Sequence, residues 1–168
     1  MSSTRVLRTK GLWLAVAESC SGGLLGARIT DEPGASAYFR GGVVAYANEV
    51  KQRVLGVSAD VLRTHGAVSA ECAQAMAGGV LKLLSADVGL AVTGNAGPGG
   101  GTLEKPVGLV YIAATGTGGK SHVQELHLAG SRTRIRTEAV EAALELLEEA
   151  LVDLPRGERP DHAYPDDR

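Results

Sequence analysis

The sequence predicts an α/β fold, a single-domain three-layer α/β/α sandwich with a mixed, mostly parallel sheet. Apolar runs of strand length alternate along the chain with segments whose apolar residues recur at helical spacing, which is typical of a sheet covered by helices on both faces. The chain has 168 residues, 44% of them hydrophobic, which suffices for one buried core. Because it contains 23 glycines and only 4% aromatic residues, we expect this core to consist of small aliphatic side chains.

The first half of the chain contains the expected elements in the order strand, helix, strand, helix. Residues 12–17 read LWLAVA, a continuous apolar run with the length of a strand that is buried on both faces. A tight loop at residues 18–23 then leads to LLGARIT, whose apolar spacing fits two helical turns. Gly41-Gly42 precede a second short strand at residues 43–46, after which Asn48 is expected to cap a short helix.

The second half adds two longer helices and three strands. Ser69 is a good N-cap for a helix whose apolar residues keep helical spacing almost without interruption. A glycine-rich loop at residues 94–101 can be neither helix nor strand. Ser131 opens a long helix with an apolar stripe opposite a row of glutamates. The three strands are expected at residues 88–93, 107–115 and 122–128, the last two as a hairpin.

Composition and charge limit the domain boundaries and the partners. We expect a short N-terminal extension at residues 1–11, the domain at 12–152 and a disordered tail at 153–168. A formal charge of -2 gives no reason to expect direct binding of nucleic acid or of an anionic membrane. Cys20 and Cys72 show no metal-binding or disulfide pattern, which favours a reducing cytoplasm. The first apolar run is too short to be a signal segment or to span a membrane.

Three segments are expected to converge at the carboxyl ends of the strands, where ligands bind in such sheets. The first segment carries Ser19 and Ser21 at the start of a helix. A hydroxyl there is well placed for a nucleophile, because backbone N–H groups beside Ser21, Gly22 and Gly23 can stabilise a developing oxyanion. The alternative is that one of the two serines merely caps the helix.

The second segment leaves the second strand and carries Tyr46 and Lys51, five residues apart. A desolvated lysine can lose its charge and take a proton from a serine hydroxyl, although a solvated surface charge is the ordinary role of a single lysine. The third segment joins Thr93 to the glycine loop, whose unhindered N–H groups can form a nest for an anion. A flexible surface loop is the alternative there.

Other polar segments give further candidates and one exclusion. Residues 114–121 (ATGTGGKS) resemble a phosphate-binding loop, but no helix pattern follows them, so we expect a hairpin turn and no ATP. His65 follows a short helix and is a candidate for orienting a substrate or transferring a proton. Arg132, Arg134 and Arg136 lie at the start of the last helix, where the helix dipole disfavours cations; this indicates an anionic ligand.

Four motifs occur in the order seen in the CinA C-terminal family: AESCSGG, PGASAYFRGGVVAYANEVK, HGAVS and TGNAGPGGGTLEKPVG. The chain resembles a stand-alone member of this family over residues 12–151. The resemblance implies an amidohydrolase of pyridine nucleotide salvage that converts nicotinamide mononucleotide to nicotinate mononucleotide and ammonia. It also implies that Ser19 is the nucleophile and Lys51 its base, with Tyr46 and His65 at matching positions around the pocket.

The predicted site therefore has a catalytic and a binding part. The catalytic residues are Ser19, Lys51 and Tyr46. The substrate-binding residues, among which the glycine loop and an arginine would hold the nucleotide phosphate, are Ser21, Gly22, Gly23, His65, Thr93, Gly94, Asn95, Gly97, Arg132 and Arg136. We expect no metal, no cofactor and a homodimer. The competing hypothesis is a non-catalytic nucleotide-binding or protein-interaction module linked to competence and DNA damage.

Overall fold

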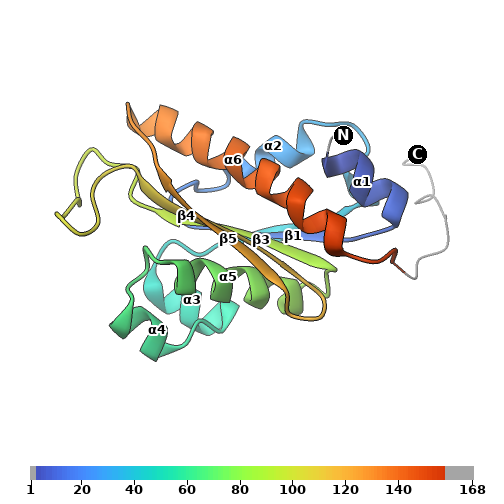
Figure 1. Cartoon of the computed structure of the whole chain (residues 1–168), viewed down its shortest axis with the longest axis horizontal. Coiled ribbons are helices and arrows are strands. Elements are labelled where there is room, and N and C mark those ends of the chain that lie inside the picture. The colour runs from blue at the N-terminus through green and yellow to red at the C-terminus, as the bar shows by residue number, and fades with distance from the viewer. Residues whose placement is uncertain (1–2, 158–168) are drawn as a thin grey trace.

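The computed structural model describes residues 3–157 and confirms the predicted three-layer sandwich (Figure 1). Its five strands are β1 Leu14–Glu18, β2 Phe39–Val44, β3 Val88–Gly94, β4 Leu109–Gly116 and β5 Ser121–His127. They form one sheet in the order β2-β1-β3-β4-β5. The three strands β1, β2 and β3 are parallel, and β4 is antiparallel to both of its neighbours, so β5 points the same way as β1.

Helices cover both faces of this sheet (Figure 1). On one face lie α1 Ser3–Lys10, α2 Leu24–Thr30 and α6 Arg132–Asp153. On the other face lie α3 Asn48–Leu55, α4 Ala59–Thr64 and α5 Ala70–Leu83. Side chains alternate along β1 between the two faces, so Leu14 and Val16 join the core under α6, while Ala15 and Ala17 join the core under α5. Both cores are built almost entirely from small and aliphatic residues, as the composition predicts.

The second strand begins earlier than the sequence predicts. Gly41 and Gly42 were expected to precede it, but both lie inside β2 and pair with Ala15 and Val16 of β1. A Cβ on Gly42 would overlap the Val16 side chain, so the close approach of the two strands requires glycine there. Asn48 was expected as a cap but is the first residue of α3, and the cap position belongs to Ala47, whose carbonyl accepts from the third and fourth N–H groups beyond it.

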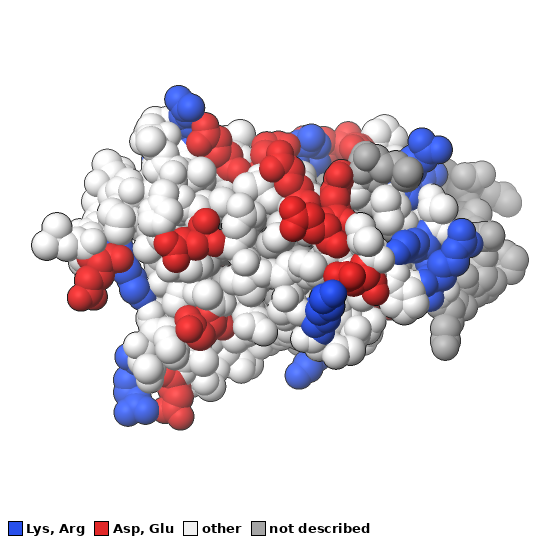
Figure 2. Space-filling model, viewed as in Figure 1, with Lys and Arg blue, Asp and Glu red and all other residues white. Residues whose placement is uncertain are grey.

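The caps and the hairpin of the second half match the prediction. Ser69 Oγ accepts a hydrogen bond from the Cys72 N–H at the start of α5, and Ser131 caps α6 in the same way. The segment that resembles a phosphate-binding loop is the turn between β4 and β5, where the Gly116 N–H donates to the Lys120 carbonyl. Figure 2 shows Asp and Glu side chains gathered over the outer surface of α6, which is the expected glutamate row.

Both ends of the described chain pack more closely than the sequence predicts. Residues 1–11 include the helix α1, whose Leu7 is buried in the core, and Lys10 Nζ donates to the Leu151 and Leu154 carbonyls at the end of α6, at 2.6 Å each. The predicted tail begins too early, because Leu154 is buried and the Gly157 N–H donates to the Lys10 carbonyl. The rest of the predicted tail, residues 158–168, lies outside the described residues. No helix within residues 3–157 has both the length and the apolar character needed to cross a membrane.

Candidate active site

The three parallel strands end at one edge of the sheet, and Ser19 lies there directly after β1. The Ser19 N–H donates to the Val92 carbonyl of β3 at 2.9 Å, and the Ala45 N–H donates to the Glu18 carbonyl at 2.8 Å. The main chain around Ser19 is therefore fixed from both sides by the neighbouring strands. Figure 1 shows the long loop between β3 and β4 projecting beyond the sheet at the same end of the molecule, where α6 begins.

Lys51 belongs to α3, and its side chain reaches Ser19 from the face of the sheet that α3, α4 and α5 cover. Its side chain is only 1% exposed. The Lys51 Nζ donates to Ser19 Oγ at 3.0 Å and to the Ala45 and Tyr46 carbonyls at 2.8 and 3.0 Å. A neutral amine has two N–H donors and one lone pair. Once one proton is lost, the two carbonyls can keep both remaining N–H donors, and the lone pair then faces the Ser19 hydroxyl.

The surroundings of Lys51 favour this neutral form. Burial lowers the pKa of Lys51, and only the weaker Coulomb attraction of Cys72 and Cys20, which acts when their thiols are ionised, opposes this shift. None of the ion pairs among residues 3–157 involves Lys51. Burial also raises the pKa of the Cys20 thiol to about 11, so this neighbour of Ser19 remains protonated and a poor nucleophile at neutral pH.

The N-terminus of α2 is neutralised by Glu18, whose buried carboxylate accepts three backbone hydrogen bonds. They come from Gly23, Leu25 and Gly26 at 2.9, 3.0 and 2.9 Å. The Gly22 N–H donates to the Ser19 carbonyl at 3.1 Å. The predicted oxyanion donors at Gly22 and Gly23 are therefore already occupied.

Two other N–H groups of the same turn are available. Within the described part of the chain, neither the Cys20 N–H nor the Ser21 N–H donates to a backbone carbonyl. Both belong to the turn that follows Ser19, so they are the backbone donors nearest to its hydroxyl along the chain. Because Cys20 lines the cleft and Ser21 is completely buried outside it, the Cys20 N–H takes the place of the glycine N–H groups as the candidate for holding an oxyanion.

The structure separates the two candidate serines. Ser21 is completely buried, and its Oγ has no hydrogen-bond partner among the described residues. Its carbonyl accepts from an Arg136 terminal nitrogen at 2.7 Å. Neither Ser21 nor Arg136 lines the cleft beside Ser19. Only Ser19 is brought to both the cleft and the lysine, and the prediction that Arg136 contacts substrate lacks a geometric basis.

A cleft of about 390 Å³ opens beside Ser19. It brings together several predicted residues from separate segments, namely Ser19, Tyr46, Gly94, Asn95, Gly97 and Arg132. The other lining residues are Cys20, Val68, Ala96, Gly99, Gly100, Thr102 and Lys105. The glycine loop thus forms one wall of the cleft. Within residues 3–157 no His, Cys, Asp and Glu side chains form a group of three or more that could hold a metal ion.

The glycine loop is held in place, in contrast to the alternative of a flexible loop. Asn95 Oδ1 accepts from the Gly97 N–H at 3.0 Å, which closes a tight turn. Arg132 donates to the Gly97 carbonyl at 2.7 Å and to the Tyr46 hydroxyl at 3.2 Å. Arg132 therefore ties the loop to the opposite wall of the cleft. The Tyr46 side chain is 59% exposed, and it is the Tyr46 carbonyl, not the hydroxyl, that contacts Lys51.

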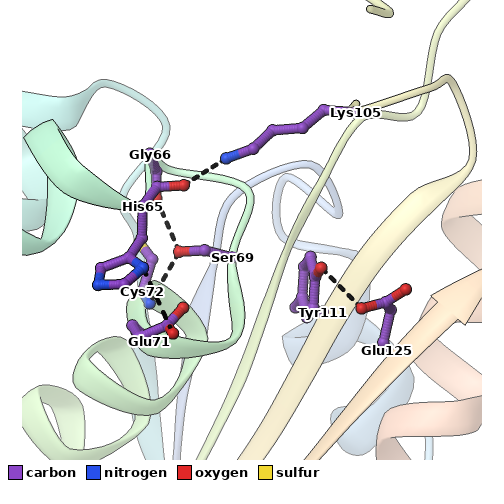
Figure 3. Close-up of polar contacts among 8 residues, drawn as sticks. All are labelled: His65, Gly66, Ser69, Glu71, Cys72, Lys105, Tyr111 and Glu125. Carbon is purple, nitrogen blue, oxygen red and sulfur yellow. Dashed lines mark hydrogen bonds and ion pairs between the residues drawn. The ribbon is translucent and has the colours of Figure 1, made fainter. Parts of the chain in front are cut away.

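Thr93 and His65 support the cleft from outside it. Thr93 is buried and its hydroxyl donates to the Ala67 carbonyl at 2.7 Å, which fixes the segment that carries Val68 into the lining. The His65 ring lies beside Glu71 with 3.4 Å between Nδ1 and the carboxylate (Figure 3). Neither Thr93 nor His65 lines the cleft. Both predicted binding residues can therefore affect a ligand only indirectly, by positioning the residues that do line it.

Sequence reasoning missed Lys105, Thr102, Val68 and Cys20 as lining residues. Lys105 and Thr102 belong to the motif TGNAGPGGGTLEKPVG, and Val68 to HGAVS, so the motifs themselves were the available signal. The motifs do not show which of their side chains reach the cleft. Lys105 meets the cleft because the β3–β4 loop folds back toward the segment before α5, and that contact joins residues 40 positions apart.

The fold and the site place the chain among α/β/α proteins that hold a buried serine–lysine pair at the carboxyl ends of their parallel strands. Residues 2–151 match the family model of the CinA C-terminal domain, and the chain belongs to this family. A protein of Halothermothrix orenii whose name includes "competence-damage inducible protein" is 54% identical over 132 residues, 79% of this chain and 32% of that protein. A CinA-like protein of Dictyoglomus turgidum is 49% identical over 149 residues, 89% of this chain and 36% of that protein. The chain thus spans about a third of the length of these relatives.

Solved structures are similar over almost their full length. The competence/damage inducible protein CihA from Agrobacterium tumefaciens is 42% identical, with a TM-score of 0.84, and the match covers 90% of this chain and 94% of that one. A CinA superfamily protein from Klebsiella pneumoniae is 36% identical, with a TM-score of 0.86 and the same two coverages. These similarities confirm the family that the four motifs indicate.

Proposed function

We propose that this chain is an amidohydrolase that deamidates nicotinamide mononucleotide, with Ser19 as nucleophile and Lys51 as general base. The observation that carries the proposal is the 3.0 Å contact between Lys51 Nζ and Ser19 Oγ, made by a lysine that is buried and lacks an ionic partner among the described residues. A structural lysine at the surface would keep its charge in water. A lysine in this position is instead suited to removing a proton from the serine.

The first half of the reaction forms an acyl-enzyme. Ser19 Oγ attacks the carboxamide carbon while its proton moves to Lys51 Nζ, and the negative charge on the carboxamide oxygen is stabilised by the Cys20 N–H group. The C–N bond then breaks, and Lys51 returns the proton to the departing nitrogen. Ammonia leaves, the nicotinoyl group of the nucleotide remains as an ester on Ser19, and Lys51 is neutral again.

The second half of the reaction hydrolyses that ester. A water molecule occupies the place of the departed ammonia, gives a proton to Lys51 and attacks the acyl carbon. The C–O bond to Ser19 breaks, and the proton passes from Lys51 to Ser19 Oγ. The products are nicotinate mononucleotide and the original enzyme, and neither a redox step nor a second substrate is required. The contacts of Lys51 with the Ala45 and Tyr46 carbonyls keep its nitrogen in place through both halves.

The rest of the nucleotide would occupy the cleft. The glycine loop exposes backbone along one wall, and Arg132 lies at the boundary between that loop and Tyr46. These features favour a ligand with an anionic end, which the mononucleotide supplies through its phosphate. The cleft therefore suits the phosphate of the same substrate whose carboxamide the Ser19–Lys51 pair would hydrolyse.

Ammonia release from purified protein tests this proposal. The substrates are nicotinamide mononucleotide and a panel of other small amides, and the variant is Ser19→Ala. The expected result is ammonia release from the mononucleotide that falls to background in Ser19→Ala. Ser121→Ala is the matched control, because Ser121 lies in the β4–β5 hairpin and contacts only Thr115 through its hydroxyl. Full activity in a folded Ser19→Ala protein would reject the assignment of the nucleophile.

A further inference from the structure

The residues that line the cleft have a one-sided charge. None of them is Asp or Glu, and two of them, Lys105 and Arg132, are cations. Neither cation takes part in any of the ion pairs found among residues 3–157. The outer surface of α6, in contrast, is covered by carboxylates (Figure 2). Two unpaired cations in a cleft without acidic residues favour an anionic ligand.

Arg132 and Lys105 differ in how they are held. Both terminal nitrogens of Arg132 are engaged, one with the Gly97 carbonyl and one with the Tyr46 hydroxyl. Arg132 thus joins two walls of the cleft and cannot move without disturbing both, so its three remaining N–H donors stay at that fixed position. The Lys105 Nζ has one hydrogen-bond partner among the described residues, the His65 carbonyl. An ammonium group has three N–H donors, so Lys105 retains donors for a ligand.

The main chain beneath Lys105 is well fixed. The Thr102 N–H donates to the Lys105 carbonyl at 3.0 Å, and the Lys105 N–H donates to Thr102 Oγ1 at 2.9 Å, which closes a tight turn. From this turn the side chain extends toward the segment before α5, where its amine meets the His65 carbonyl beside Gly66 (Figure 3). A Cβ on Gly66 would lie 2.7 Å from the Lys105 nitrogen, so glycine leaves room for the amine.

This arrangement combines a fixed base with a mobile charged end. The four-carbon stem of a lysine turns at low cost, and the His65 carbonyl that it would leave lies at an exposed position that water can reach. The exchange of the neutral His65 carbonyl for a phosphate oxygen is favourable, because the ammonium of Lys105 gains the Coulomb attraction of an opposite charge. Lys105 is therefore the lining cation that can respond to a ligand.

We propose that Lys105 binds the phosphomonoester of the substrate and thereby makes the enzyme prefer a mononucleotide over the corresponding nucleoside. Arg132 then serves mainly to hold the Gly97 and Tyr46 walls together. This inference rests on the proposed function, since it names the part of the substrate that the same cleft recognises. It assigns specificity to a residue outside the catalytic pair, on a loop that follows β3.

The test compares two substrates that carry the same carboxamide, nicotinamide mononucleotide and nicotinamide riboside, which lacks the phosphate. In Lys105→Met, kcat/KM for the mononucleotide is expected to fall by about 10- to 100-fold, mostly through a higher KM, because one charged hydrogen bond is lost. The value for the riboside is expected to stay within about twofold of the wild type, because the Ser19–Lys51 pair is unchanged. Lys105→Arg keeps the charge and should retain most of the preference.

Lys82→Met is the matched control, since Lys82 is an exposed lysine of α5 that does not line the cleft. It should leave kcat/KM for both substrates unchanged. An equal loss for both substrates in Lys105→Met, or no loss for either, would overturn the inference. The first result would mean that Lys105 supports the cleft as a whole, and the second that the phosphate binds elsewhere.

A binding experiment separates this inference from the proposed function. Nicotinate mononucleotide and nicotinic acid riboside are titrated into wild type and Lys105→Met, and affinity is measured by calorimetry. If the wild type prefers the phosphorylated ligand and the variant does not, the inference stands even when no ammonia is released from any amide. If ammonia is released but the preference is the same in both proteins, the proposed function stands and the inference fails.

Discussion

Replacement of Lys51 by Met tests the general base most directly, because it keeps the length and the apolar stem and removes only the amine. The lost group is the one 3.0 Å from Ser19 Oγ. A positioned general base usually contributes 10²–10⁴-fold, so kcat/KM for nicotinamide mononucleotide should fall by about 10²-fold or more. A factor of 10² corresponds to about 2.7 kcal/mol of transition-state stabilisation.

The same substitution should change the free energy of unfolding little. The Ala45 and Tyr46 carbonyls lose their contacts with the amine, at a cost on the order of 1 kcal/mol each. The variant no longer has to bury an amine at a site that is 1% exposed. The desolvation cost that is avoided offsets a comparable part of the free energy lost at the two carbonyls. A thermal melt within a few degrees of the wild type would therefore show that the loss of activity is chemical and not a failure to fold.

The pH dependence of the wild type checks the same assignment. Burial lowers the pKa of Lys51, and only the neutral amine can accept the serine proton. Below this lowered pKa the amine is protonated and inactive, so kcat/KM rises with pH through it and levels off above it. This rise should be absent from the residual activity of Lys51→Met and unchanged in the surface control Lys82→Met.

Lys51→Arg separates proton transfer from simple attraction of an anion. Its guanidinium keeps the positive charge and cannot be deprotonated at these pH values, so we expect a variant that binds the mononucleotide and does not turn it over. A Lys51→Arg protein with near wild-type turnover would refute the reasoning. Lys51 would then bind phosphate, and Ser19 would need another base, for which His65 is the first alternative although it does not line the cleft.

Two further predictions concern the turn after Ser19 and the need for a metal. Glu18→Gln replaces a carboxylate that accepts three N–H bonds with an amide that has one acceptor oxygen. The free energy of unfolding, measured by thermal melts, should fall by about 1–3 kcal/mol, and kcat from steady-state rates should fall with it. An unchanged kcat would mean that this carboxylate does not position Ser19. Activity should persist in excess chelator and without ATP, because the catalytic steps use only Ser19, Lys51 and a backbone N–H group; loss in chelator that one added metal restores would reveal a missed site.

The elements of the fold were largely predictable because their signals are local. The apolar run before Glu18, the glycine loop after β3 and the caps Ser69 and Ser131 all depend on neighbouring residues, and the structure places each of them as expected. The start of β2 was missed, because Gly41 and Gly42 break a strand in isolation and fit one only when β1 lies against them.

The site was predictable as a set of segments but not as a geometry. Ser19 and Lys51 were candidates from their residue types and from the family motifs, yet their contact joins residues 32 positions apart. Which serine faces the lysine depends on the turn after β1. Which N–H groups remain available depends on the Glu18 side chain, because it engages the start of α2.

By itself, the sequence determined the order of strands and helices from β1 onward, the aliphatic core and the family, since apolar spacing, turn residues and motifs are properties of short stretches of chain. Only the tertiary structure decided that Lys51 is buried against two carbonyls, that Ser21 is buried outside the cleft and that Lys105 lines it. Protonation and access are set by burial and by partners that the sheet order brings together from distant segments. These quantities exist only once the chain is folded.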